Sequence, residues 1–110
     1  MEIDHTVRNM VKLIETLGEI PTDRNVVIDF FADWCGPCKM IAPKFNELEA
    51  QFPSVTFLKA NVDDAEALAE QFGVRAMPTF IFMKKGKVLG KVEGADLKKI
   101  IAMLEALDDN

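Results

Sequence analysis

Residues 26–38 read VVIDFFADWCGPC, and this stretch holds both the strongest strand signal of the chain and its two cysteines. Val26–Phe31 is a continuous β-branched and aromatic run, which is typical of a central strand covered on both faces. Cys35 and Cys38 follow at the point where the strand ends and a helix is expected to begin. Pro37 suits the first turn of that helix, because an N–H group there would have no partner within the helix. The stretch therefore predicts a strand, a turn and a helix, with both cysteines at the turn.

The spacing of the two cysteines favours redox chemistry. Cys35 and Cys38 lie three residues apart, which brings two sulfurs close enough to form a disulfide. A helix N-terminus presents free N–H groups and a positive dipole end, and both stabilise a thiolate, the form that attacks disulfides. We expect Cys35 to be the exposed nucleophile and Cys38, one turn deeper, to be the resolving thiol. Half of a zinc site or two inert core cysteines are the alternatives, but a C-x-x-C motif within a βαβ pattern favours the redox interpretation.

Apolar periodicity and turn residues predict the elements on either side of this stretch. The expected strands are 2–6, 26–31, 55–60, 79–83 and 88–92, and the expected helices are 7–17, from the second cysteine to about 52, 64–72 and 95–107. The order β-α-β-α-β-α-β-β-α is typical of an α/β fold whose first strands are parallel and whose last pair is antiparallel. Asp63 and Glu66 resemble a capping box for helix 64–72. Residues 84–87 are expected to form a four-residue hairpin loop.

Length and composition exclude several classes of protein. The 110 residues fit one domain spanning 1–110. The net charge of −5 disfavours nucleic acid or an anionic membrane surface as the main partner. No apolar run approaches the length of a transmembrane helix, and residues 1–5 lack the pattern of a signal peptide. Two cysteines and one histidine do not complete a four-ligand zinc site of the usual kind, so we expect no metal.

A carboxylate interrupts the apolar strand at Asp29. Burial there would disfavour the charged form and raise the pKa of Asp29. We interpret Asp29 as a general base that deprotonates Cys38 during resolution, directly or through water. The alternative is an aspartate on a locally polar face or one tied to a backbone N–H. Lys59, on the adjacent strand, is the expected charged neighbour, and a snorkelling surface lysine is the equally weighted alternative.

Residues 34–39, WCGPCK, resemble the thioredoxin active-site motif residue for residue. Residues 27–30 (VIDF), 77–80 (MPTF) and 94–95 (GA) match the same family, and the resemblance covers nearly the whole chain. It implies a thioredoxin fold, a five-stranded mixed sheet flanked by four helices. Phe31 is a departure, because many thioredoxins carry a tryptophan there. The resemblance also implies a cis peptide bond before Pro78 and a substrate groove formed by Trp34, Gly36, Pro37, Met77, Pro78 and Gly94.

The thioredoxin resemblance further implies reduction of protein disulfides without a bound cofactor, because the dithiol itself carries two electrons. NADPH would supply these electrons through a separate thioredoxin reductase. The implied targets are peroxiredoxins, methionine sulfoxide reductases and ribonucleotide reductase, and the implied state is a cytoplasmic monomer. A disulfide-forming oxidase or isomerase of secreted proteins is one alternative, disfavoured by Gly36-Pro37 and by the missing signal peptide. A binding module that uses the fold as a scaffold is a second alternative, which an intact motif leaves open.

Overall fold

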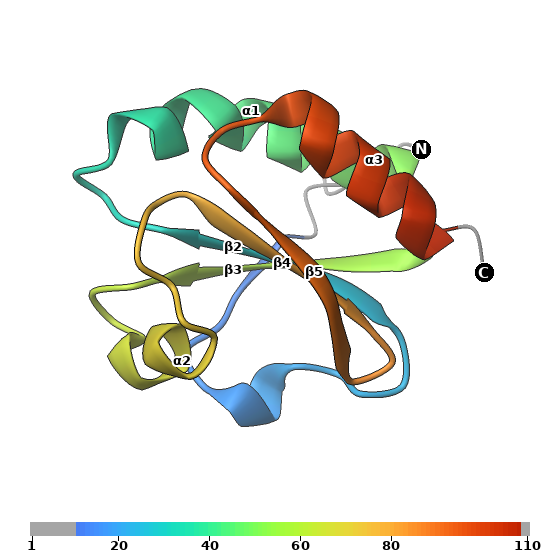
Figure 1. Ribbon diagram of the computed structural model, residues 1–110, viewed down its shortest axis with the longest axis horizontal. Helices are drawn as coiled ribbons and strands as arrows, with labels where there is room; N and C mark the ends of the chain where they lie inside the picture. The colour runs from blue at the N-terminus through green and yellow to red at the C-terminus, as the bar shows by residue number, and fades with distance from the viewer. Residues whose placement is uncertain (1–10, 109–110) are drawn as a thin grey trace, which may run out of the picture.

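The computed structural model describes residues 11–108, which form a five-stranded mixed sheet between two helical layers. The strand order is β1-β3-β2-β4-β5. In Figure 1, α1 and α3 cover one face of the sheet and α2 covers the other. The bounds are β1 Lys12–Leu13, β2 Asn25–Phe31, α1 Gly36–Gln51, β3 Val55–Asn61, α2 Glu66–Gln71, β4 Thr79–Lys84, β5 Lys87–Glu93 and α3 Leu97–Asp108.

Strand β2 lies at the centre of the sheet, as its apolar run predicts. It pairs in parallel with β3 and antiparallel with β4. Successive side chains point to opposite faces of a strand. Accordingly, Val27 belongs to the core under α1 and α3, whereas Val26, Ile28 and Phe30 belong to the core under α2. The prediction of a strand covered on both faces is therefore confirmed, and Asp29 falls on the same side as Val27.

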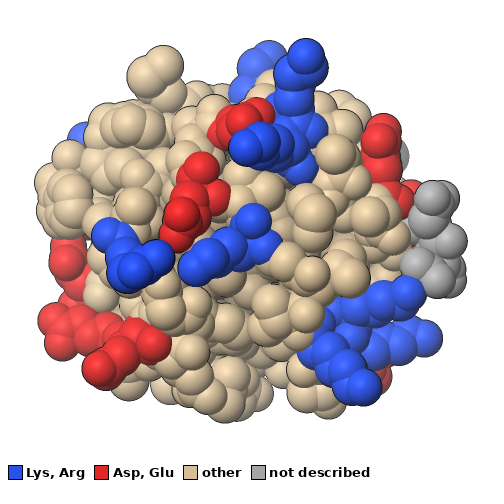
Figure 2. All heavy atoms as spheres, in the orientation of Figure 1, with Lys and Arg blue, Asp and Glu red and all other residues tan. Residues whose placement is uncertain are grey.

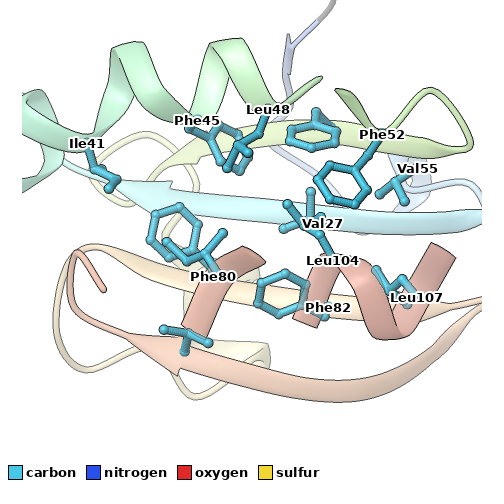
Figure 3. Packing of buried hydrophobic residues seen from close by; sticks show 13 residues of the cluster. Val27, Ile41, Phe45, Leu48, Phe52, Val55, Phe80, Phe82, Leu104 and Leu107 are labelled. Atoms are coloured by element: carbon cyan, nitrogen blue, oxygen red, sulfur yellow. The ribbon is translucent and has the colours of Figure 1, made fainter. Parts of the chain in front are cut away.

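Aromatic packing fixes α1 against the sheet (Figure 3). The Phe45 ring lies 5.0 Å from the Phe57 ring and 5.4 Å from the Phe80 ring, between centroids. All three side chains are at most 1% exposed, and each contributes about 2–3 kcal/mol through burial. Leu104 and Leu107 of α3 are fully buried in the same core. This packing fixes α1 across β3 and β4 and so sets where the helix begins relative to β2.

The N-terminal part of the chain differs from the prediction. The expected strand 2–6 lies outside the described residues, and the expected helix 7–17 is wrong over residues 11–17. Lys12–Leu13 instead forms β1, which pairs in parallel with β3, and the Ile14 N–H donates to the Lys59 carbonyl at 2.8 Å. Pairing with an existing strand edge and burial of Ile14 outweigh a helical spacing of apolar residues.

The connection from β1 to β2 contains only a short 3-10 helix, η2, over Leu17–Glu19. The Glu19 carboxylate accepts hydrogen bonds from the Thr16 N–H and the Glu15 N–H, both at 3.0 Å. Residues 11–108 thus contain three α-helices and this single turn, where the family resemblance implies four helices.

Two smaller predictions also need correction. Helix α2 has Ala65 at its N-cap and no side-chain cap, so the expected capping role of Asp63 is wrong. The hairpin loop is shorter than expected, because β4 ends at Lys84 and β5 begins at Lys87. Lys85 and Gly86 make the turn with φ of 47° and 87°, the left-handed pair that matches the twist of two antiparallel strands.

Candidate active site

Cys35 lies between the end of β2 and the start of α1, Cys38 lies in the first turn of α1, and the two form a disulfide. Cys35 is the N-cap of α1, and its Cα lies 5.3 Å from that of Cys38. The Cys38 N–H donates to the Cys35 Sγ, with 3.2 Å between nitrogen and sulfur. One of the free N–H groups of the helix start therefore points at Cys35. That contact and the helix dipole favour a thiolate on this sulfur when the disulfide opens.

Burial does not distinguish the two sulfurs in the oxidised form. Cys35 is 5% exposed and Cys38 is 4% exposed, so the expectation of an exposed Cys35 is wrong for this state. Both belong to a small cluster with Ala32, against which Phe31 and Met77 pack. These side chains pack against the disulfide, and Cys35 differs from Cys38 in its position at the helix N-cap.

Asp29 is a buried carboxyl group behind the disulfide. It is 4% exposed, and its Oδ1 has no hydrogen-bond partner among residues 11–108. Burial raises its pKa from 3.8 to about 7, and the nearby charge of Lys59 lowers it by a smaller amount. The sequence-based expectation of a buried aspartate with a raised pKa is therefore confirmed. Near neutral pH this carboxyl group can both accept and release a proton.

A cavity of about 170 Å³ connects Asp29 with one of the two cysteines. Its walls include Asp29, Lys59 and Cys38, but Cys35 is not among its lining residues. A cavity of this size has room for several water molecules, and its polar wall residues offer them hydrogen-bond partners. Asn46 of α1 also contributes to the wall, and nothing in its sequence position signals that role. The fold thus brings together Asp29, Lys59 and Cys38 as the sequence predicts.

Trp34 lies on the surface beside the disulfide. It is 68% exposed, and its indole Nε1 donates to the Asp63 Oδ2 at 3.0 Å. This contact joins residues 29 positions apart, so no local sequence pattern could predict it. Asp63 therefore accepts from the indole, while Ala65 occupies the N-cap position of α2.

The other predicted groove residues lie on both sides of the disulfide. Met77 packs against the cysteine cluster, and the Met77–Pro78 peptide bond is cis, as the resemblance implies. The Gly94 N–H donates to the Pro78 carbonyl at 2.8 Å, and Gly94 has a φ of 95° that favours glycine. Gly36 and Pro37 are exposed at the start of α1.

The charged side chains on the face drawn in Figure 2 form several separate groups with uncharged surface between them. Lys and Arg do not merge there into one continuous basic area. Among the described residues, no helix has the length and hydropathy that crossing a bilayer requires. Within that same part of the chain, His, Cys, Asp and Glu form no group of three or more suited to holding a metal ion.

A C-x-x-C disulfide at a helix N-terminus, set at the end of the central strand of this mixed sheet, defines a thiol–disulfide oxidoreductase. The thioredoxin family matches residues 9–106, and the chain belongs to that family. It is a protein-disulfide reductase that works by dithiol–disulfide exchange through Cys35 and Cys38 and is recycled by thioredoxin reductase.

Individual relatives agree with this assignment. A thioredoxin H-type of Picea mariana is 50% identical over 90 residues, which cover 79% of this chain and 72% of that protein. The oxidised mitochondrial thioredoxin 3 of Saccharomyces cerevisiae superimposes with a TM-score of 0.85 and 36% identity, over 91% of this chain and 98% of that one. A structure concerned with thiol resolution in yeast mitochondrial 1-Cys peroxiredoxin via the glutathione and thioredoxin systems gives a TM-score of 0.84 and 36% identity, over 88% and 95% of the two chains.

Proposed function

We propose that Cys35 is the attacking sulfur, that Cys38 resolves the intermediate, and that Asp29 takes the proton of Cys38. The Cys35 thiolate attacks a target disulfide, forms a mixed disulfide and releases one target sulfur as a thiolate. Cys38, deprotonated by Asp29, then attacks the Cys35 sulfur, closes the intramolecular disulfide and releases the second target sulfur. Two electrons pass from the dithiol to the target, whose two released thiolates take up protons.

The cavity behind the disulfide carries this assignment. Asp29 shares its walls with Cys38 and not with Cys35, so a proton relayed through the cavity serves the second step rather than the first. A carboxyl group whose pKa is about 7 accepts that proton near neutral pH and returns it to water between turnovers. Lys59 lines the same cavity and supplies the positive charge that favours the ionised carboxylate.

Trapping of the mixed disulfide tests the order of the two sulfurs. Cys38→Ser should still attack a disulfide protein but should accumulate as a covalent adduct at Cys35, because the resolving thiol is gone. Cys35→Ser is the matched control and should form no adduct. Mass spectrometry of both variants after exposure to insulin distinguishes the outcomes, and adducts at Cys38 of the Cys35→Ser protein would overturn the assignment.

The proposed electron route runs from NADPH through thioredoxin reductase to the dithiol and on to target proteins. Trp34, Gly36, Pro37, Met77, Pro78 and Gly94 would form the surface on which those targets dock. Peroxiredoxins, methionine sulfoxide reductases and ribonucleotide reductase are the proposed targets, and the likeness to the structure concerned with a yeast peroxiredoxin supports the first of them. Turnover of NADPH with purified reductase and each oxidised target tests the route. A protein that is not reduced in this assay is not a target of this chain.

A cytoplasmic location and a monomeric, single-domain state over residues 1–110 complete the proposal. The family match over residues 9–106 supports one domain. The yeast relative named above is mitochondrial, so the family is not confined to one compartment. Imaging of the tagged natural protein tests the location, and light scattering of the purified chain tests the monomer. A mitochondrial signal or a concentration-independent dimer would refute the respective part.

A further inference from the structure

Phe31, the residue that replaces the common tryptophan, lies close to the ammonium group of Lys59, the residue that pairs with Asp29 across β2 and β3. It ends β2, is half-buried, and lines the cavity together with Asp29 and Cys38. The Lys59 Nζ lies 5.9 Å from the centre of the Phe31 ring. A lysine ammonium within about 6 Å of an aromatic centroid is attracted to the negative face of the ring.

The backbone of Lys59 is held tightly, while its ammonium group has few partners. Lys59 lies opposite Asp29 in the parallel β2–β3 register, and its carbonyl accepts from the Ile14 N–H at 2.8 Å. Among residues 11–108, no ion pair within 4.0 Å joins Lys59 to a carboxylate. Besides the charge interaction with Asp29, the ring contact is the interaction that the described residues offer to its charged end, and a lysine side chain without such a contact samples many rotamers.

We propose that Phe31 is a positioning residue for disulfide reduction, because its ring holds the Lys59 ammonium at the cavity that leads to Asp29 and Cys38. This inference rests on the proposed role of Asp29 as the base. A cation kept at the cavity favours the ionised carboxylate, which is the form that accepts the proton of Cys38. Without the ring, the lysine side chain would extend into water and the carboxyl group would keep its proton to higher pH.

Other groups face the same cavity and have to stay unchanged in any test. Lys39 of α1 and Asp33 of the loop before it contribute charge to the wall. From β4, Phe80 lies opposite Asp29 in the antiparallel register and adds no charge. Substitutions at Phe31 and Lys59 leave all of these groups in place, so a change in the titration of Asp29 can be assigned to the pair.

The experiment is a double-mutant cycle read by carbon NMR of the Asp29 carboxyl group. Phe31→Leu should raise the pKa of Asp29, because a lysine released from the ring no longer keeps its charge beside the carboxyl group, and the rise should not exceed the one that Lys59→Met produces. Phe31→Trp should keep the pKa at or below that of the natural chain, since tryptophan binds cations best. In a Lys59→Met background, neither change at Phe31 should move the pKa.

Each outcome decides the inference. If Phe31→Leu shifts the pKa of Asp29 equally in the natural chain and in Lys59→Met, then Phe31 acts only as a wall of the cavity. If Phe31→Leu leaves the pKa of Asp29 unchanged, then the ring does not hold the lysine. Either result overturns the proposal.

If Phe31→Leu does not fold, Phe31→Met repeats the comparison with a longer side chain and no ring. The pH profile of mixed-disulfide resolution is measured on the same variants and on Asp29→Asn. An unchanged rate in Asp29→Asn would refute the base, while the NMR cycle still reports on Phe31 and Lys59.

Discussion

Replacing Asp29 by asparagine should stabilise the oxidised protein, and the gain should grow with pH. The folded-state pKa of about 7 lies about three units above the ordinary value of 3.8. Below the ordinary value the group is protonated in both states and contributes nothing to the pH dependence. Between the two values the unfolded chain releases the proton and the folded chain keeps it, so stability falls by about 1.36 kcal/mol per pH unit.

Above pH 7 the accumulated loss amounts to about 4 kcal/mol, which is a large part of the stability of a small domain. An asparagine side chain cannot ionise, so the variant avoids this loss while keeping a side chain of nearly the same shape. The difference in the free energy of unfolding between variant and natural chain should therefore rise from its value at pH 4 by about 4 kcal/mol at pH 8.

Urea unfolding of both proteins at one-unit pH intervals measures this difference. The oxidised form is used throughout, so that the cysteines do not titrate. Asp64→Asn serves as the control, because Asp64 is exposed and its substitution removes the same charge from the surface; its effect should stay within about 0.5 kcal/mol at every pH. If the free energies of unfolding of Asp29→Asn and the natural chain depend on pH in the same way, the charge of Asp29 is not buried. The raised pKa that supports Asp29 as the base would then be refuted.

Three other changes test the surroundings of the disulfide and the core. Trp34→Phe removes the indole donor to Asp63 and should lower the rate constant of insulin reduction severalfold, whereas equal rates would show that the contact does not orient the ring. Gly94→Ala should lower the free energy of unfolding by about 1–2 kcal/mol, because alanine is strained at a φ of 95°. Gly18→Ala is the control: it has open space around it and no such φ, so it should change the free energy of unfolding by less than about 0.5 kcal/mol. An unchanged free energy of unfolding in Gly94→Ala would show that alanine is not strained there. Leu104→Ala should cost about 3 kcal/mol in a urea titration, and a loss below about 1 kcal/mol would mean that α3 repacks freely.

The sequence predicts best those features that short-range chemistry determines. The β-branched and aromatic run from Val26 to Phe31 predicts a buried strand, and the structure places this strand at the centre of the sheet. Cys35 and Cys38 define the start of α1 because a proline and a thiolate both suit a helix N-terminus. Asp29 is recognisable for a related reason, since a single carboxylate within an apolar strand is conspicuous.

Features that depend on contacts between distant segments are not predictable in this way. Residues 11–17 carry apolar side chains at helical spacing, yet Ile14 is buried because β1 pairs with β3, and that pairing has no signature in a segment so short. Asp63 and Glu66 have the spacing of a capping box, but the Asp63 carboxylate binds an indole from a distant part of the chain. The reach of Lys59 toward the Phe31 ring likewise depends on side-chain conformation across two strands.

The disulfide belongs to a cluster of its own, apart from the two large hydrophobic cores on either face of the sheet. Its two cysteines are joined across a single helical turn, with 5.3 Å between their Cα atoms. We therefore expect the opening of this bond to leave the packing of both cores in place and to confine structural change to the first turn of α1. We expect the reduced and oxidised proteins to have the same overall structure. A partner protein would then distinguish them by the thiols or the disulfide at Cys35 and Cys38 rather than by shape.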